Sequence, residues 1–126
     1  SLKPAEALYQ LPDAAFDVIT LWHVLEHVYD LDGYFANMQR VLKPGGAIFI
    51  GVPNYTSPDA QHYGTYWAAY DVPRHLYHFS PHSMAMLANR HAFTLVSRRA
   101  MWFDAYYIAL LSEQYKHGKQ RFLLAL

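Results

Sequence analysis

The sequence predicts an α/β fold built on a mostly parallel sheet, chiefly because of two apolar runs and the segment between them. Residues 16–22 (FDVITLW) and 47–52 (AIFIGV) are rich in β-branched and aromatic residues, as strands are. Their nearly continuous apolar character is typical of parallel strands that are covered by helices. The segment between them has helical spacing and ends at Pro44-Gly45-Gly46, so the three parts form one βαβ unit.

The helices and a third strand follow from caps and periodicity. Asp30 or Asp32 can cap the first helix, and Ser80-Pro81 opens a second that runs to about Arg90. Residues 103–116 predict a third helix, and residues 93–101 predict a third strand. The inward residues of the first helix recur at helical spacing: Leu31, Tyr34, Phe35, Met38, Val41 and Leu42.

Composition narrows the functional classes. The 126 residues suit one domain, and ten basic and ten acidic side chains cancel, so we expect no nucleic-acid partner. The absence of cysteine excludes disulfides, thiolate metal sites and a cysteine nucleophile, and it fits a cytoplasmic location. No stretch approaches the roughly 20 apolar residues of a membrane span, so we expect no membrane association.

The stretch His23-Val-Leu-Glu26-His27 has the H-x-x-E-H pattern of inverted zinc peptidases. That interpretation is disfavoured, because the motif follows a strand directly instead of lying within a long helix. A metal site remains an alternative, since residues i, i+3 and i+4 share one face if the turn is helical. Such a site would favour zinc or iron over magnesium. The primary prediction includes no metal.

Three stretches together resemble a known family: FDVITLWHVLEHV, VLKPGGAIFIGVPN and DVPRHLYHFSPHSM. They resemble class I S-adenosylmethionine-dependent methyltransferases, most closely the group that includes ubiquinone-type O-methyltransferases, over about residues 11–100. The resemblance implies a Rossmann-like fold, S-adenosylmethionine as cofactor, and methyl transfer to a small-molecule acceptor.

The glycine-rich cofactor loop of that family is missing from this sequence, which has 6 Gly and no G-x-G-x-G. We therefore expect residues 1–126 to form a single partial domain, the C-terminal half of a catalytic domain, that is inactive by itself. Its open sheet edges favour a homodimer. The alternative is a half-fold that serves as a non-catalytic interaction module.

The resemblance also assigns residues to the site. Leu21, Trp22 and His23 would border the methionine end of the cofactor, at the carboxyl end of a parallel strand where such sheets bind ligands. Glu26 and His27 would line the pocket, or would simply cap the following turn.

The loop from Asn54 to about Phe79 carries a second group of side chains: Tyr63, Tyr66, Trp67, Tyr70, Arg74, His75, Tyr77 and His78. One interpretation is a lid over the acceptor, in which Tyr66, Trp67, Arg74 and Tyr77 bind the substrate. The residues then predicted to accept the proton of the acceptor are His27, His75 and His78. The other interpretation is an aromatic cluster that packs a long loop.

Overall fold

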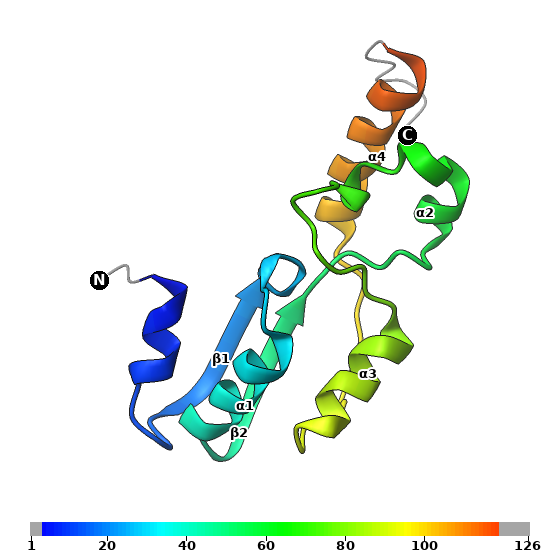
Figure 1. The fold of residues 1–126 in the computed structure, drawn as a ribbon. Coiled ribbons are helices and arrows are strands. Elements are labelled where there is room, and N and C mark those ends of the chain that lie inside the picture. The colour runs from blue at the N-terminus through cyan, green and yellow to red at the C-terminus, as the bar shows by residue number, and fades with distance from the viewer. Residues whose placement is uncertain (1–3, 119–126) are drawn as a thin grey trace.

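The computed structural model describes residues 4–118, which form an α/β arrangement (Figure 1). In chain order the elements are η1 (Ala5–Gln10), β1 (Phe16–Trp22), η2 (Leu25–His27), α1 (Leu31–Val41), β2 (Leu42–Gly51), α2 (Pro58–Tyr63), η3 (Gly64–Tyr66), η4 (Ala68–Tyr70), α3 (Pro81–Arg90) and α4 (Trp102–His117). The predicted fold class is confirmed, with parallel strands joined through a helix.

The sheet of the described residues consists of β1 and β2, which pair in parallel. Phe16 pairs with Leu42, and the regular ladder then runs from Val18 opposite Ala47 to Trp22 opposite Gly51. Residues 43–46 bulge out between these pairs, and Gly45 has a φ of 79°. The predicted glycine turn is therefore present as a bulge inside the second strand, which begins five residues earlier than expected.

The prediction of a third strand over residues 93–101 is wrong. These residues run without regular secondary structure from the end of α3 to the start of α4. Their side chains are largely exposed, with Val96 exposed at 94%. A strand exists only where its backbone groups pair with a neighbour, and no described strand lies beside this run.

The predicted helix starts are confirmed at the level of single hydrogen bonds. Asp30 caps α1, and its Oδ1 accepts the Gly33 N–H at 2.9 Å. Ser80 caps α3 in a reciprocal capping box with Ser83, and Pro81 occupies the first helical turn. These side chains satisfy amide groups that a helix leaves free at its start.

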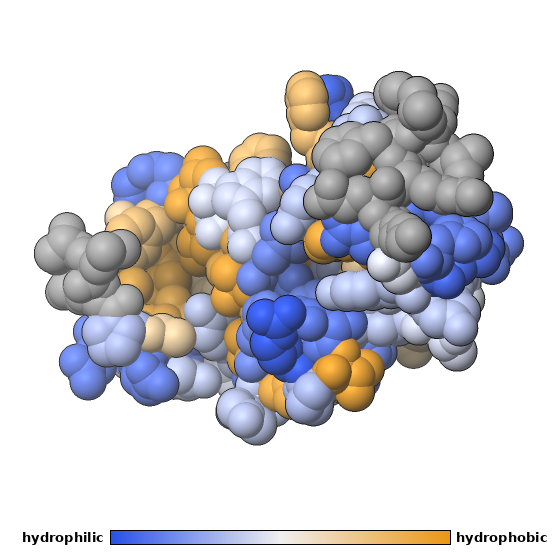
Figure 2. Space-filling model, turned by 90° about the horizontal axis from the view of Figure 1, so that it is seen from above, coloured by the Kyte–Doolittle hydropathy of each residue, from blue (hydrophilic) through white to orange (hydrophobic). Residues whose placement is uncertain are grey.

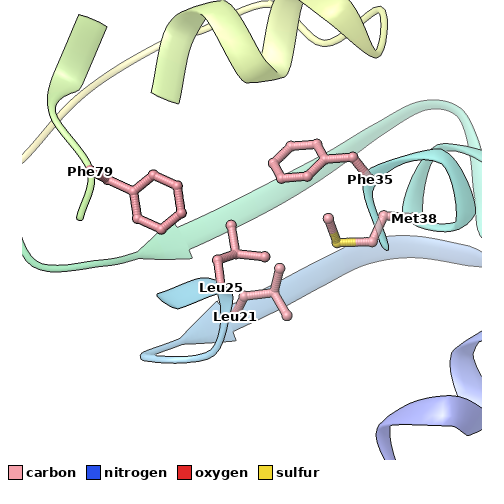
Figure 3. Packing of buried hydrophobic residues seen from close by; sticks show 5 residues of the cluster. All are labelled: Leu21, Leu25, Phe35, Met38 and Phe79. Atoms are coloured by element: carbon pink, nitrogen blue, oxygen red, sulfur yellow. The ribbon is translucent and has the colours of Figure 1, made fainter. Parts of the chain in front are cut away.

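The main core lies on one face of the sheet, between β1, β2, α1 and α3. Five buried residues form its centre (Figure 3): Leu21, Leu25, Phe35, Met38 and Phe79. The opposite face of the sheet stays open, because Val18 is exposed at 51% and Trp22 and Phe49 at 54% each. The expectation that helices cover the sheet is thus met on one side of the described sheet.

A second cluster joins the long loop to α4. Ala60, Tyr63, Trp67 and Ala69 are buried there, with Ile108 and Ala109 of α4 packed against them. Ser112 of α4 connects the loop with this helix. Its Oγ accepts the Ala68 N–H at 2.8 Å and donates to the Ile108 carbonyl at 2.7 Å. The loop is therefore held in a fixed position beside the carboxyl end of the sheet (Figure 1).

Among the described helices, none combines the length and the apolar character that crossing a membrane requires.

Candidate functional site

Polar side chains collect where the two parallel strands end, the edge of such sheets that binds ligands. The chain leaves β1 through His23, whose φ of 53° is left-handed and whose N–H donates to the Gly51 carbonyl at 2.9 Å. A left-handed non-glycine residue carries strain of roughly 1–3 kcal/mol, a feature that clusters at functional sites. Figure 2 looks down on this end of the molecule, where hydrophilic and hydrophobic residues lie next to each other.

The His23 imidazole lies between two carboxylates. Its Nε2 is 2.9 Å from Asp104 Oδ2, and its Nδ1 is 3.4 Å from Glu26 Oε1. Asp104 belongs to the first turn of α4 and was not identified from the sequence. No local pattern marks it, because the contact joins residues that lie 81 positions apart.

Glu26 is the most unusual residue of the site. It is exposed at only 1%, and neither of its carboxylate oxygens has a hydrogen-bond partner within residues 4–118. Its backbone carbonyl accepts the Leu76 N–H at 2.7 Å, which fastens the loop to η2. A buried carboxylate without partners is costly, so this position is explained by a ligand better than by packing.

His27 and His75 come together from segments 48 residues apart. Their ring centroids lie 4.8 Å from each other in an edge-to-face arrangement. His27 Nδ1 lies 3.0 Å from the Arg74 carbonyl oxygen, and His75 Nδ1 lies 2.8 Å from that of Ala69. A carbonyl only accepts, so each Nδ1 donates and each Nε2 keeps a lone pair when the ring is neutral.

The other predicted residues of the loop have neighbours of their own. Arg74 donates to Asp71 Oδ1 through Nε at 3.0 Å and Nη2 at 2.6 Å, and this hydrogen bonding raises the pKa of Arg74. The Tyr77 hydroxyl donates to the Tyr29 carbonyl at 3.1 Å. The Tyr77 bond fixes the loop against the segment that follows β1, whereas the Arg74 bonds lie within the loop.

His78, Tyr66 and Trp67 lie toward the second cluster. His78 donates from Nε2 to the Tyr70 carbonyl at 2.9 Å, with its ring edge-to-face against the Tyr70 ring. Trp67 is buried, and its indole Nε1 has no partner in the described part of the chain, whereas Tyr66 is half exposed. The structure thus brings His23, Glu26, His27 and His75 together, and His78 stands outside that group.

The three residues predicted at the cofactor end differ in their surroundings. Leu21 is buried in the core, whereas Trp22 is exposed and its ring lies against Gly51. A Cβ at Gly51 would come within 2.7 Å of that ring, so only glycine fits beneath the indole. An exposed indole face and nearby carboxylates suit a cationic group such as a sulfonium. The described residues therefore fit one side of an S-adenosylmethionine site, and the sequence contains no G-x-G-x-G cofactor loop.

Comparison with known proteins connects this geometry with a family. Residues 3–98 match the family model described as a methyltransferase domain. A probable S-adenosylmethionine-dependent methyltransferase of Mycolicibacterium smegmatis is 41% identical over 44 residues, which are 35% of this chain and 17% of that protein. The ubiquinone/menaquinone biosynthesis C-methyltransferase UbiE of Shewanella piezotolerans is 52% identical over 46 residues, 36% of this chain and 18% of that protein.

The alignments with these relatives span less than a fifth of their length. The corresponding enzyme of Shewanella frigidimarina is 50% identical over the same extent, 46 residues. No solved structure matches the chain.

Proposed function

The chain belongs to the methyltransferase domain family, and from this premise we propose that its parent protein transfers a methyl group from S-adenosylmethionine to a small-molecule acceptor. The observation that carries the proposal is the family match over residues 3–98. The position of the polar cluster supports it, because ligands of parallel sheets bind beyond the carboxyl ends of the strands. The chain itself is proposed to be one partial domain that provides one wall of the site.

The proposed cofactor end of the site is the edge formed by Leu21, Trp22 and His23. Leu21 anchors the strand end in the core, and the exposed Trp22 ring offers a face for the positively charged sulfonium. The Asp104 carboxylate holds the His23 imidazole in place at 2.9 Å. When bound, the cofactor supplies an electrophilic methyl group on sulfur.

The proposed acceptor side is the loop over η3, η4 and the residues that follow. Tyr66 and Tyr77 provide partly exposed aromatic surface and Arg74 a cationic group, while Trp67 is buried in the second cluster and anchors the loop there. Much of the catalysis of methyl transfer is the positioning of the two reactants. The fixed loop fits that requirement.

Proton acceptance is assigned to the imidazoles of His27, His75 and His78. In neutral rings, His27 and His75 donate from Nδ1 to backbone carbonyls, so each Nε2 can take a proton from an acceptor hydroxyl or amine. His78 donates from Nε2, so its Nδ1 is the free nitrogen. The proton of the acceptor thus moves to an imidazole nitrogen as the acceptor atom attacks the methyl group.

Calorimetric titration of S-adenosylhomocysteine tests the proposal. It is carried out with this chain and with a chain extended upstream by about a hundred residues of the parent gene, since the cofactor turns of such folds lie on earlier strands. We expect binding by the extended chain and weak or no binding by the chain itself. Binding by neither would contradict the cofactor assignment and favour a non-catalytic interaction module.

A further inference from the structure

The side chains of Glu26, His27 and His75 form a group of three donors that could hold a metal ion. One donor atom from each residue lies within 4.8 Å of the others. Zinc binds imidazole nitrogen and carboxylate oxygen at about 2.0–2.2 Å in tetrahedral geometry, so two donors around one ion lie roughly 3.3–3.6 Å apart. Side-chain movements that shorten the longest donor separation by roughly 1.2–1.5 Å bring all three donors into contact with one ion.

Glu26 provides an independent reason to expect a cation. Its carboxylate is buried, and both oxygens lack hydrogen-bond partners in the described residues. Two imidazole nitrogens approach Oε1 among the described residues: His23 Nδ1 at 3.4 Å and His75 Nε2 at 4.0 Å. A buried carboxylate in such a position is normally paired or bound to a metal.

The two histidines are already oriented as ligands. A metal-bound histidine nearly always donates its other ring N–H to a carboxylate, a carbonyl or water, which fixes the tautomer. His27 and His75 both do this through Nδ1, to the carbonyls of Arg74 and Ala69. The Nε2 lone pairs thus remain for the metal.

The backbone holds the two ligand segments in register. The Leu76 N–H donates to the carbonyl of Glu26 itself, and the Tyr77 hydroxyl donates to the Tyr29 carbonyl. The ligands are thus fixed before any ion arrives. His27 is exposed, so the site opens to solvent on its side.

We propose that Glu26, His27 and His75 bind a divalent transition-metal ion, with zinc as the reference ion, and leave a coordination position open. Two imidazoles and one carboxylate favour zinc or iron(II) over magnesium and calcium, which prefer oxygen ligands. His23 is left outside the ligand set, because its Nε2 lies 2.9 Å from Asp104 Oδ2 and its imidazole is not among the donors that lie within 4.8 Å of one another. Asp71 stays beside the site, with Oδ2 at 3.7 Å from His75 Nε2 and Oδ1 paired with Arg74.

The metal site does not depend on the proposed methyl transfer, since it is built entirely from residues of this chain. If both hold, the ion replaces His27 and His75 as the group that activates the acceptor, because an oxygen bound to such an ion loses its proton more easily. An Nε2 that binds the ion has no lone pair left for a proton, so His27 and His75 cannot be metal ligands and proton acceptors at the same time.

The test is a titration of the metal-free chain with zinc by calorimetry and with cobalt(II) by visible absorption. We expect one ion per chain and a cobalt spectrum of low coordination number. Glu26→Gln, His27→Ala and His75→Ala are each expected to weaken binding at least about 100-fold, beyond the 10–100-fold that outer-shell partners contribute. His82→Ala is the matched control, because His82 lies exposed on α3 and away from the site, and it should bind like the wild type.

Circular dichroism verifies that each variant is folded. Should His75→Ala fail to fold, Glu26→Gln carries the test, because it removes the charge and keeps the shape. No binding by the wild type, or equal binding by the wild type and Glu26→Gln, would overturn the proposal. Equal binding would mean that exposed histidines bind the ion adventitiously. None of these results depends on S-adenosylhomocysteine binding, so the failure of one proposal is distinguishable from the failure of the other.

Discussion

At the scale of single residues, Glu26 is held in a position that stability alone does not favour. It is exposed at 1% with no partner for either carboxylate oxygen in the described chain. Replacing buried charged groups by apolar side chains of similar volume is often stabilising by about 1–4 kcal/mol. An acidic residue that is kept at a buried position where it costs stability is typical of a functional position.

We therefore expect Glu26→Leu to raise the free energy of unfolding of the metal-free chain by about 1 kcal/mol or more, while it abolishes zinc binding. Urea denaturation in the presence of a chelator measures the first effect, and calorimetry the second. Glu26→Gln is the control that keeps the polar shape. A clear loss of stability in Glu26→Leu would mean that the carboxylate stabilises the fold through His23 and His75.

Substitution of Trp22 tests whether its indole ring binds the cationic sulfonium or only contributes to packing. If its exposed indole faces the sulfonium, Trp22→Ala in the extended chain should weaken S-adenosylmethionine binding about 2–30-fold, the equivalent of roughly 0.5–2 kcal/mol. S-adenosylhomocysteine carries no positive sulfur, so its binding should change less. Phe49→Ala is the matched control, because Phe49 is also exposed at 54% on the neighbouring strand. Equal losses for both ligands would exclude the cation interaction.

The free energy of unfolding is expected to depend on pH in the alkaline range because of Tyr63. Burial, followed by the nearby Glu113 carboxylate, raises the pKa of Tyr63 from 10.0 to about 12. The neutral phenol is thus favoured in the folded state, so its contribution is complete below pH 10 and is lost as the pH rises to about 12.

Wild type is therefore expected to lose unfolding free energy between pH 10 and 12, on the order of 1 kcal/mol after solvent screening, that Tyr63→Phe does not lose. Denaturant unfolding of both proteins across this range measures the difference. Tyr115→Phe, at an exposed position of α4, should follow the wild type. Parallel pH profiles of wild type and Tyr63→Phe would show that Tyr63 ionises without strain.

At the scale of elements, α3 depends on its first turn. Ser80 and Ser83 form reciprocal hydrogen bonds, with Ser83 N–H to Ser80 Oγ at 3.0 Å and Ser80 N–H to Ser83 Oγ at 2.9 Å. Phe79, which directly precedes the cap, is part of the main core. The cap therefore fixes both the start of the helix and the position of a core residue.

Ser80→Ala should lower the free energy of unfolding by about 1 kcal/mol, the usual value for loss of a serine cap. Hydrogen exchange should increase at the first amides of α3. Ser57→Ala provides a comparison, because Ser57 caps the shorter α2 in a similar way through the Ala60 N–H. If amide exchange in α3 stays unchanged in Ser80→Ala, the helix is positioned by packing alone.

At the scale of the whole molecule, the sheet of the described residues has two strands and one uncovered face. Unpaired strand edges and exposed apolar side chains such as Val18 and Phe49 promote association with other chains. The homodimer expected from the sequence stays a prediction, and this surface is where we expect it to form.

We expect sedimentation velocity to show a concentration-dependent dimer that Val18→Lys shifts to monomer, since a charge on the open apolar face opposes its burial against another copy. Met86→Lys is the control, because Met86 is similarly exposed but lies on α3. A wild-type chain that remains monomeric at all concentrations would contradict the prediction.

Much of the local structure was determined by the sequence itself. The caps at Asp30 and Ser80, the helix over Trp102–His117 and the parallel pairing of the two apolar runs follow from short-range hydrogen bonding and periodicity. The motifs also identified the family. Residues 93–101 show the limit of such patterns, because β propensity becomes a strand only beside a partner.

Only the tertiary structure decided which side chains meet. The sequence grouped His23 with Glu26 and His27, since they are neighbours in the chain. The folded molecule keeps His23 Nδ1 3.4 Å from Glu26, adds Asp104 on the other side of the His23 ring, and places His75 beside Glu26 and His27. Backbone hydrogen bonds between η2 and the loop bring these residues together, and contacts of this range leave no periodic trace in the sequence.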